Sequence, residues 1–149
     1  MAQNFDLSGQ LKAPFGVKYD NLGRVIIFAR AHTTLTAGTP YRIKYDEYGP
    51  FTAALADDAD SYRVGIAKLA TPTNGIAELV HGGPYSGLVT GSLSCTVGHG
   101  LGIRGGAITD EGADFDDLHD AVFALVYTAS SSSTTQDVIM IPEVITAST

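Results

Sequence analysis

Short apolar segments separated by turn residues run through most of this chain. They are rich in β-branched and aromatic residues, as at Val25, Ile26, Ile27 and Phe28. Strands at roughly ten-residue spacing are typical of a β-sandwich or barrel, so we predict a compact all-β fold with at most one short helix. The ten predicted strands are 24–31, 41–44, 50–54, 62–67, 76–80, 85–90, 101–103, 107–109, 121–127 and 138–141.

Glycine-rich segments at 73–75, 81–84, 105–106 and 111–112 predict the turns between these strands. One helical turn is predicted at 115–118, where Asp114 is placed to cap it. Residues 121–127 are apolar throughout, which predicts a central strand buried on both faces. The last strand, ended by Pro142, is expected to pair within the barrel or across a subunit boundary, because a free apolar edge favours aggregation.

One strand-and-turn pattern occurs twice, about sixty residues apart. The first copy begins with Thr36-Ala37-Gly38 and the second with Thr96-Val97-Gly98. Each continues through a short strand, a glycine turn, an acidic pair and an apolar run, which ends near residue 67 in one copy and 127 in the other. Neither copy repeats a catalytic residue, so the pattern favours a scaffold that acts through surface contact.

Residues 1–23 are predicted to form an extended arm in front of a domain spanning 24–149. The arm is expected to bind a partner, with apolar side chains packing on a neighbouring subunit and two lysines meeting carboxylates. These residues are Phe5, Leu7, Leu11, Phe15, Lys12 and Lys18.

Composition narrows the functional classes. A chain of 149 residues, 44% hydrophobic and only 17% charged, is long enough for one core and too apolar for disorder. With one cysteine, Cys95, it has no internal disulfide framework. The first residues lack the features of a secretory signal, and no apolar run approaches the length of a membrane span, so no membrane association is expected.

The net charge of −7 is unevenly distributed. Residues 1–45 hold six of the nine Lys and Arg against two acidic residues, a net charge of +4, and the remainder carries −11. This asymmetry indicates contacts between copies or with an acidic partner, although two ordinary solvated surfaces explain it equally well. Nucleic acid is not expected as a partner, because the basic residues are scattered and the later carboxylates repel phosphate.

Several short motifs match catalytic or cofactor patterns without their structural context. Residues 100–105 fit the glycine pattern of dinucleotide sites, but a β-like segment follows where that site needs a helix. Cys95 and His99 lie about 13 Å apart on an extended chain, so they form a nucleophile–base pair only if a turn brings them together. His81-Gly82-Gly83-Pro84 is similar to an esterase oxyanion loop, but the matching nucleophile elbow is missing, and a hairpin loop is predicted instead. We therefore expect no enzyme activity and no cofactor.

Metal binding receives little support from the sequence. The four histidines show no metal-ligand spacing. The acidic residues of 110–120 lack the order of a calcium loop, so a solvated or partner-facing acidic loop is the main interpretation and a bound cation stays open.

The turn at 35–38, the glycine-rich segment 95–109, the strand at 121–126 and the segment 64–69 together resemble the small capsid decoration (cement) proteins of tailed bacteriophages. The resemblance covers roughly residues 35–142. It implies a virion protein made in the host cytoplasm, often trimeric, that binds the outside of an assembled head and bridges neighbouring major capsid protein subunits. It brings no catalytic residues.

Two other classes stay open. One is another phage structural component, such as a head fibre or tail protein. The other is a carbohydrate-binding or hydrolytic β-domain, in which tyrosines would stack on sugars. The candidate tyrosines are Tyr19, Tyr41, Tyr45, Tyr48 and Tyr85.

Overall fold

A computed structural model describes residues 16–56, 63–113, 122–128, 130–131 and 134–145. The described chain is all-β and contains no helix, which confirms the predicted fold class. The helical turn predicted at 115–118 lies outside the described residues. The twelve strands are β1 (Val17–Tyr19), β2 (Val25–Arg30), β3 (Pro40–Asp46), β4 (Gly49–Ala53), β5 (Arg63–Ala67), β6 (Ile76–Val89), β7 (Ser94–Cys95), β8 (Gly100–Arg104), β9 (Ala107–Gly112), β10 (Val122–Val126), β11 (Ser130–Ser131) and β12 (Thr135–Ile145).

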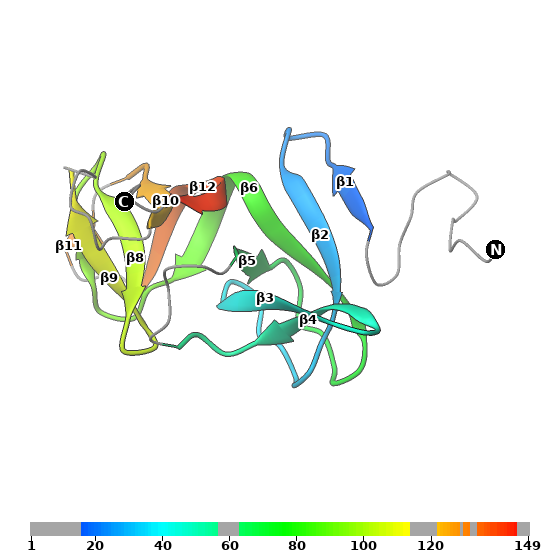
Figure 1. The fold of residues 1–149 in the computed structure, drawn as a ribbon. Coiled ribbons are helices and arrows are strands. Elements are labelled where there is room, and N and C mark those ends of the chain that lie inside the picture. The colour runs from blue at the N-terminus through cyan, green and yellow to red at the C-terminus, as the bar shows by residue number, and fades with distance from the viewer. Residues whose placement is uncertain (1–15, 57–62, 114–121, 129, 132–133, 146–149) are drawn as a thin grey trace.

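Ten strands form one sheet in the order β1-β2-β4-β3-β5-β6-β12-β10-β8-β9, with an additional pairing of β2 to β6. Because β2 pairs with both β4 and β6, the strands β2, β4, β3, β5 and β6 form a closed five-stranded barrel, seen at the right of Figure 1. The closing contact between β2 and β4 is parallel and joins Arg30 to Phe51. In a closed barrel each strand pairs on both sides, so the paired stretches of these strands have no free edge.

The long strand β6 connects the two halves of the molecule. Residues 76–82 pair with β2, and residues 83–89 pair with β12. The turn and the two separate strands predicted around 81–84 are therefore wrong. Gly83, at φ 93°, allows the strand to bend there, and Arg24 packs so closely that a Cβ on Gly83 would lie 3.1 Å from the Arg24 Cα.

The two halves share one pattern of strand pairing. In the first half β5 meets β6 at Ile66 and Val80. In the second half β10 meets β12 at Leu125 and Ile139, each 59 positions later (66 to 125, 80 to 139). The order β4-β3-β5-β6 is accordingly matched by β9-β8-β10-β12 (Figure 1). The twofold pattern of the sequence thus corresponds to two similar units of structure.

The turns that begin each copy make the same hydrogen bonds. The amide of Gly38 donates to the carbonyl of Ala67 at 2.8 Å. The amide of Gly98 donates to the carbonyl of Val126 at 3.0 Å. Both glycines have positive φ angles, 81° and 84°, a conformation that glycine adopts without steric cost. The repeated Thr-x-Gly turn therefore fixes the start of the first hairpin in each half.

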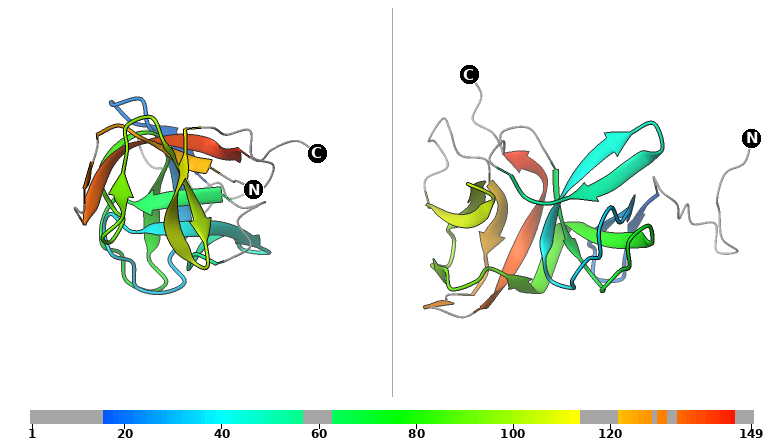
Figure 2. Two further views of the ribbon diagram at one scale, coloured as in Figure 1. Left: turned by 90° about the vertical axis from the view of Figure 1, so that its left-hand side faces the viewer. Right: turned by 90° about the horizontal axis from the view of Figure 1, so that it is seen from below.

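The cores explain why only the first half forms a closed barrel. One cluster, which includes Ile27, Leu35, Ile43 and Leu79, fills the closed barrel. The larger cluster combines buried residues of the second half with four residues of the first half, which lie on β2, β5 and β6. These four, Ile26, Val64, Ile66 and Val80, point outward from the barrel. The outside of the first half therefore packs against the open interior of the second. Figure 2 shows the strands of the two halves from two further directions.

Both ends of the described chain belong to the sheet. Within the predicted arm, Val17–Tyr19 form β1 and pair antiparallel with β2. The predicted last strand pairs with both β6 and β10, as expected, but it begins at Thr135 and continues through Pro142 to Ile145. The two-residue strands β7 and β11, which pair with each other, were not predicted.

Candidate interaction surfaces

Of the six residues predicted to bind a partner, only Lys18 lies within the described chain. Its Nζ lies 2.7 Å from Oε1 of Glu78 and 5.3 Å from the ring centroid of Phe28. Lys18 therefore meets a carboxylate of its own chain, and its role toward a partner stays a prediction. The other five, Phe5, Leu7, Leu11, Lys12 and Phe15, lie outside the described residues.

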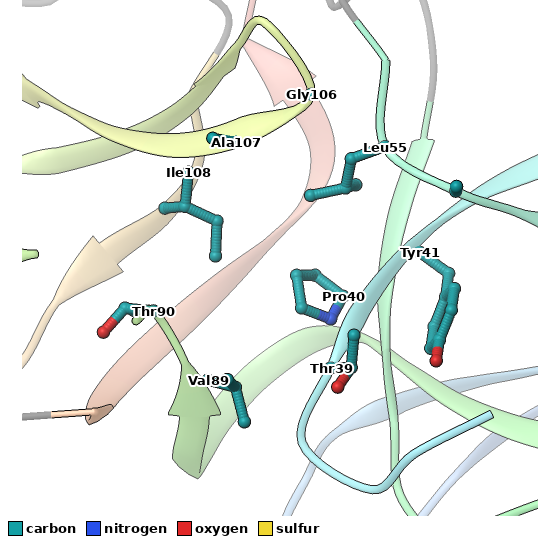
Figure 3. A pocket seen from close by; sticks show the side chains of 10 residues that line it. Thr39, Pro40, Tyr41, Leu55, Val89, Thr90, Gly106, Ala107 and Ile108 are labelled. Atoms are coloured by element: carbon teal, nitrogen blue, oxygen red, sulfur yellow. The ribbon is translucent and has the colours of Figure 1, made fainter. Parts of the chain in front are cut away.

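A cleft of about 310 Å³ lies between the two halves. Figure 3 shows Pro40, Leu55 and Ile108 directed into it from three separate segments. Val89 and Ala107 also line it, and they occupy the places that correspond to the closing pair Arg30 and Phe51 of the first barrel. The cleft therefore marks the position at which the second half does not close.

The side chains that line the cleft are mainly apolar. Its lining consists of apolar side chains, backbone and the hydroxyl-bearing Thr39, Tyr41 and Thr90, without a carboxylate or a histidine. Thr90 Oγ1 is buried without a hydrogen-bond partner among the described residues. Such a site holds an apolar group and offers no acid–base pair.

A second surface is the outer side of β6, β12 and β10 in the second half. Pro84, Ile139 and Leu125 are consecutive cross-strand partners, so their side chains form one row on this side. Ile139 is 42% exposed and Tyr127, at the end of β10, is 64% exposed. Large exposed apolar side chains gathered on one sheet face mark an interaction site more often than isolated ones do.

A groove of about 310 Å³ runs beside this row. Leu22, Tyr85 and Tyr127 contribute apolar walls. The two charged side chains of the groove, Asp137 and Arg24, have hydrogen-bond partners within the chain, since Ser86 Oγ donates to Oδ1 of Asp137 at 2.7 Å and Arg24 Nε donates to Asp20 at 2.6 Å. The groove therefore presents mainly apolar surface.

The tyrosines that could stack on sugars are dispersed. Tyr19, Tyr45 and Tyr48 are exposed, but Tyr45 lies beside Arg63 and Tyr48 beside Arg30, at 5.9 and 5.7 Å from the guanidinium carbon to the ring centroid. The other two are half-buried. The hydroxyl of Tyr41 accepts from the Thr36 amide, and that of Tyr85 donates to the Ala67 carbonyl.

Cys95 and His99, considered above as a nucleophile–base pair, each hydrogen-bond to a different group in the structure. The side chain of Cys95 is 4% exposed, and its Sγ donates to the Leu93 carbonyl. Burial raises the pKa of the Cys95 thiol, and the charge of Asp110 raises that pKa further. His99 Nδ1 lies 2.8 Å from Oδ1 of the same Asp110. The thiol is thus held in its unreactive form, and the imidazole is engaged by a carboxylate.

The remaining motifs belong to strands and turns. Residues 100–105 form β8 and the start of the tight turn into β9, so no helix follows those glycines. His81 is buried in β6, with Nδ1 2.7 Å from the Val64 carbonyl oxygen. Neither arrangement provides a phosphate-binding helix terminus or an oxyanion loop.

The described residues contain no group of His, Cys, Asp and Glu side chains that could hold a metal ion. In the acidic stretch, Asp110 contacts His99 and Glu111 pairs with Arg104, while 114–120 lies outside the described residues. Within the part of the chain that the structure describes, no helix is long and apolar enough to cross a membrane.

Comparison with known proteins finds a likeness of fold. No family model matches the sequence, and no curated protein matches it. Among solved structures, the chain is similar to the head fiber gp8.5 N base of bacteriophage phi29, with a TM-score of 0.51 and 12% identity. The two chains share a fold. The alignment covers 80% of this chain and 96% of the phi29 chain, so the likeness spans both halves and not a single barrel.

Proposed function

We propose that this chain is a structural protein of a phage virion that binds the outer surface of the assembled capsid and bridges neighbouring major capsid protein subunits. The observation that supports it best is the fold shared with 96% of a phage head fiber base. Fold alone does not determine function, so the surfaces have to support the same conclusion.

The surfaces agree with a binding role without catalysis. Apolar side chains gather on an outer sheet face and in the cleft between the halves. The motifs that matched catalytic patterns are occupied by structural contacts, as for Cys95 and His81. A protein that binds many equivalent lattice sites stabilises the shell through mass action and multivalency, and it needs no reacting group.

We further propose that the N-terminal arm makes the contact with the capsid and that the protein acts as a trimer. Phe5, Leu7, Leu11 and Phe15 would pack on a neighbouring subunit, with Lys12 and Lys18 meeting its carboxylates. For Lys18 this requires exchange of its partner Glu78, at little cost for a partly exposed ion pair.

The test is deletion of residues 2–15. Gly16 is retained because its carbonyl accepts the Phe28 amide. We expect the truncated protein to keep the melting temperature of the full chain and to lose attachment to purified capsids in a co-sedimentation assay. The matched control replaces the polar Ser8 and Gln10 by alanine, which should leave attachment unchanged. Full occupancy of capsids by the truncated protein would contradict the role of the arm.

A second candidate is the base of a head fibre, favoured by what the similar phi29 structure is. In that case the chain also attaches to the head, but it supports a further protein instead of stabilising the lattice. Electron microscopy of virions carrying gold-labelled protein distinguishes the two. A decoration protein labels the lattice uniformly, whereas a fibre base labels the foot of each fibre.

A further inference from the structure

We propose that the outer face of β6, β12 and β10 in the second half is a contact between copies of this chain. This face, called here the second-half outer face, consists of Pro84, Leu125, Tyr127 and Ile139, with Leu22 at its margin. The inference rests on the oligomer of the proposed function and deepens it, because it names the surface through which the copies meet.

The internal repeat gives the first argument. Leu125 and Ile139 of the second half occupy the places of Ile66 and Val80 in the first. Ile66 and Val80 are 0% exposed because the second half of the same chain packs over them, whereas Ile139 is 42% exposed. One apolar surface thus occurs twice, and a single chain covers it only once.

The electrostatics of the face give the second argument. Arg24 forms an ion pair with Asp20, with side chains only 13% and 9% exposed, whereas Asp137 accepts a hydrogen bond from the Ser86 hydroxyl and keeps its negative charge. Asp137 is thus the one carboxylate among the residues that line the groove, and it lies beside the apolar row, where interfaces carry their polar rim. Interfaces between identical subunits are on average more apolar than those between transient partners.

The third argument is shape. The groove beside the row, about 310 Å³ and lined by Leu22, Tyr85 and Tyr127, is open at the surface. An apolar side chain from a second copy fits such a groove, with the exposed Tyr127 ring beside it. Tyrosines in this position are common among the residues that dominate binding energy. The occupant we assign is therefore a second copy of this chain.

The test compares charged substitutions at sites of similar exposure. Ile139→Asp and Tyr127→Asp place a carboxylate on the second-half outer face. Leu69→Asp adds the same charge at a site that is 62% exposed and outside this face. Mass is measured by light scattering during size exclusion and by sedimentation equilibrium, and folding is checked by circular dichroism and melting temperature.

We expect an oligomer for the unchanged chain and for Leu69→Asp. We expect dissociation for both face variants, with the dissociation constant raised by about 100-fold because a buried, unpaired carboxylate is strongly unfavourable. A monomeric unchanged chain, an oligomer unaffected by Ile139→Asp, or equal dissociation of Leu69→Asp would each overturn the proposal. Capsid co-sedimentation of the same variants separates the outcomes. If Ile139→Asp stays oligomeric but no longer binds capsids, the face belongs to the capsid protein and the contact between copies is refuted.

Discussion

Gly38 lies directly against the backbone of Gly87. A Cβ added to Gly38 would stand 2.7 Å from the Gly87 carbonyl oxygen, nearer than real Cβ atoms approach backbone oxygen. The same turn also joins the end of β6, because the Val89 amide donates to the Gly38 carbonyl at 2.9 Å. The first Thr-x-Gly turn therefore anchors the bent strand that passes into the second half.

Replacement of the two repeated glycines separates backbone strain from packing. Both have positive φ, but nothing lies within 4 Å of a Cβ on Gly98. We expect G98A to lower the free energy of unfolding by about 1 kcal/mol through backbone strain, and G38A to lower it by roughly 3 kcal/mol because the contact with Gly87 adds to that strain. Urea denaturation of the two variants measures the difference, and equal losses would contradict the close approach.

The turn between β1 and β2 should respond to acid. Burial pushes the pKa of Asp20 upward, but hydrogen bonds from the Arg24 amide and guanidinium and from the Leu22 amide outweigh this and hold the pKa below its ordinary value. A carboxylate with a lowered folded-state pKa stabilises the fold above its unfolded pKa, and that stabilisation is lost as the pH falls through the folded value.

D20N should therefore reduce the melting temperature at pH 7, where the carboxylate is ionised in both states. The difference from the unchanged chain should shrink as the pH falls from about 4 toward 2. Calorimetry across this range measures it. A difference that stays constant with pH would show that the Asp20 charge does not contribute.

The thiol of Cys95 should be protected in the folded protein. Burial and the charge of Asp110 both raise its pKa, so little thiolate is present at pH 8 and reagents have poor access. We expect reaction with an aromatic disulfide reagent to be roughly 100-fold slower in the native protein than in urea. Equal rates would mean that β7 opens readily.

Thr90 offers a stabilising substitution. Its Oγ1 is buried without a partner among the described residues. T90V keeps the shape of the side chain and removes the unpaired hydroxyl, so the free energy of unfolding should rise by about 1 kcal/mol. Thr39→Val, in the same cleft, is the comparison, and the two are measured by chemical denaturation. A loss of stability in T90V would show that the hydroxyl is satisfied, for example by water.

The repeat and most strands were predictable because turn chemistry is local. The pairs Thr36/Gly38 and Thr96/Gly98 carry a backbone requirement that a sequence displays directly. The continuity of β6 was not predictable, since Gly82, Gly83 and Pro84 individually favour a turn. These residues are extended because they pair with β2 and β12, which lie far away in the sequence.

The candidate surfaces were less accessible to prediction. Ile66 and Ile139 belong to similar apolar segments, yet one is buried and the other exposed. The difference arises from which half packs over which, a long-range relationship that periodicity does not contain. The strands β7 and β11 were missed for a related reason, because each is too short to form without the other.

The dependence of the second half on the last strand affects how the protein is made. The first barrel is complete once residue 89 has left the ribosome, and it can close while synthesis continues. Ile26, Val64, Ile66 and Val80 then remain uncovered until β12 has been translated. A ribosome that stalls before β12 therefore releases a chain whose first barrel exposes an apolar outer surface, and slow decoding of the codons for β10 to β12 should increase inclusion-body formation.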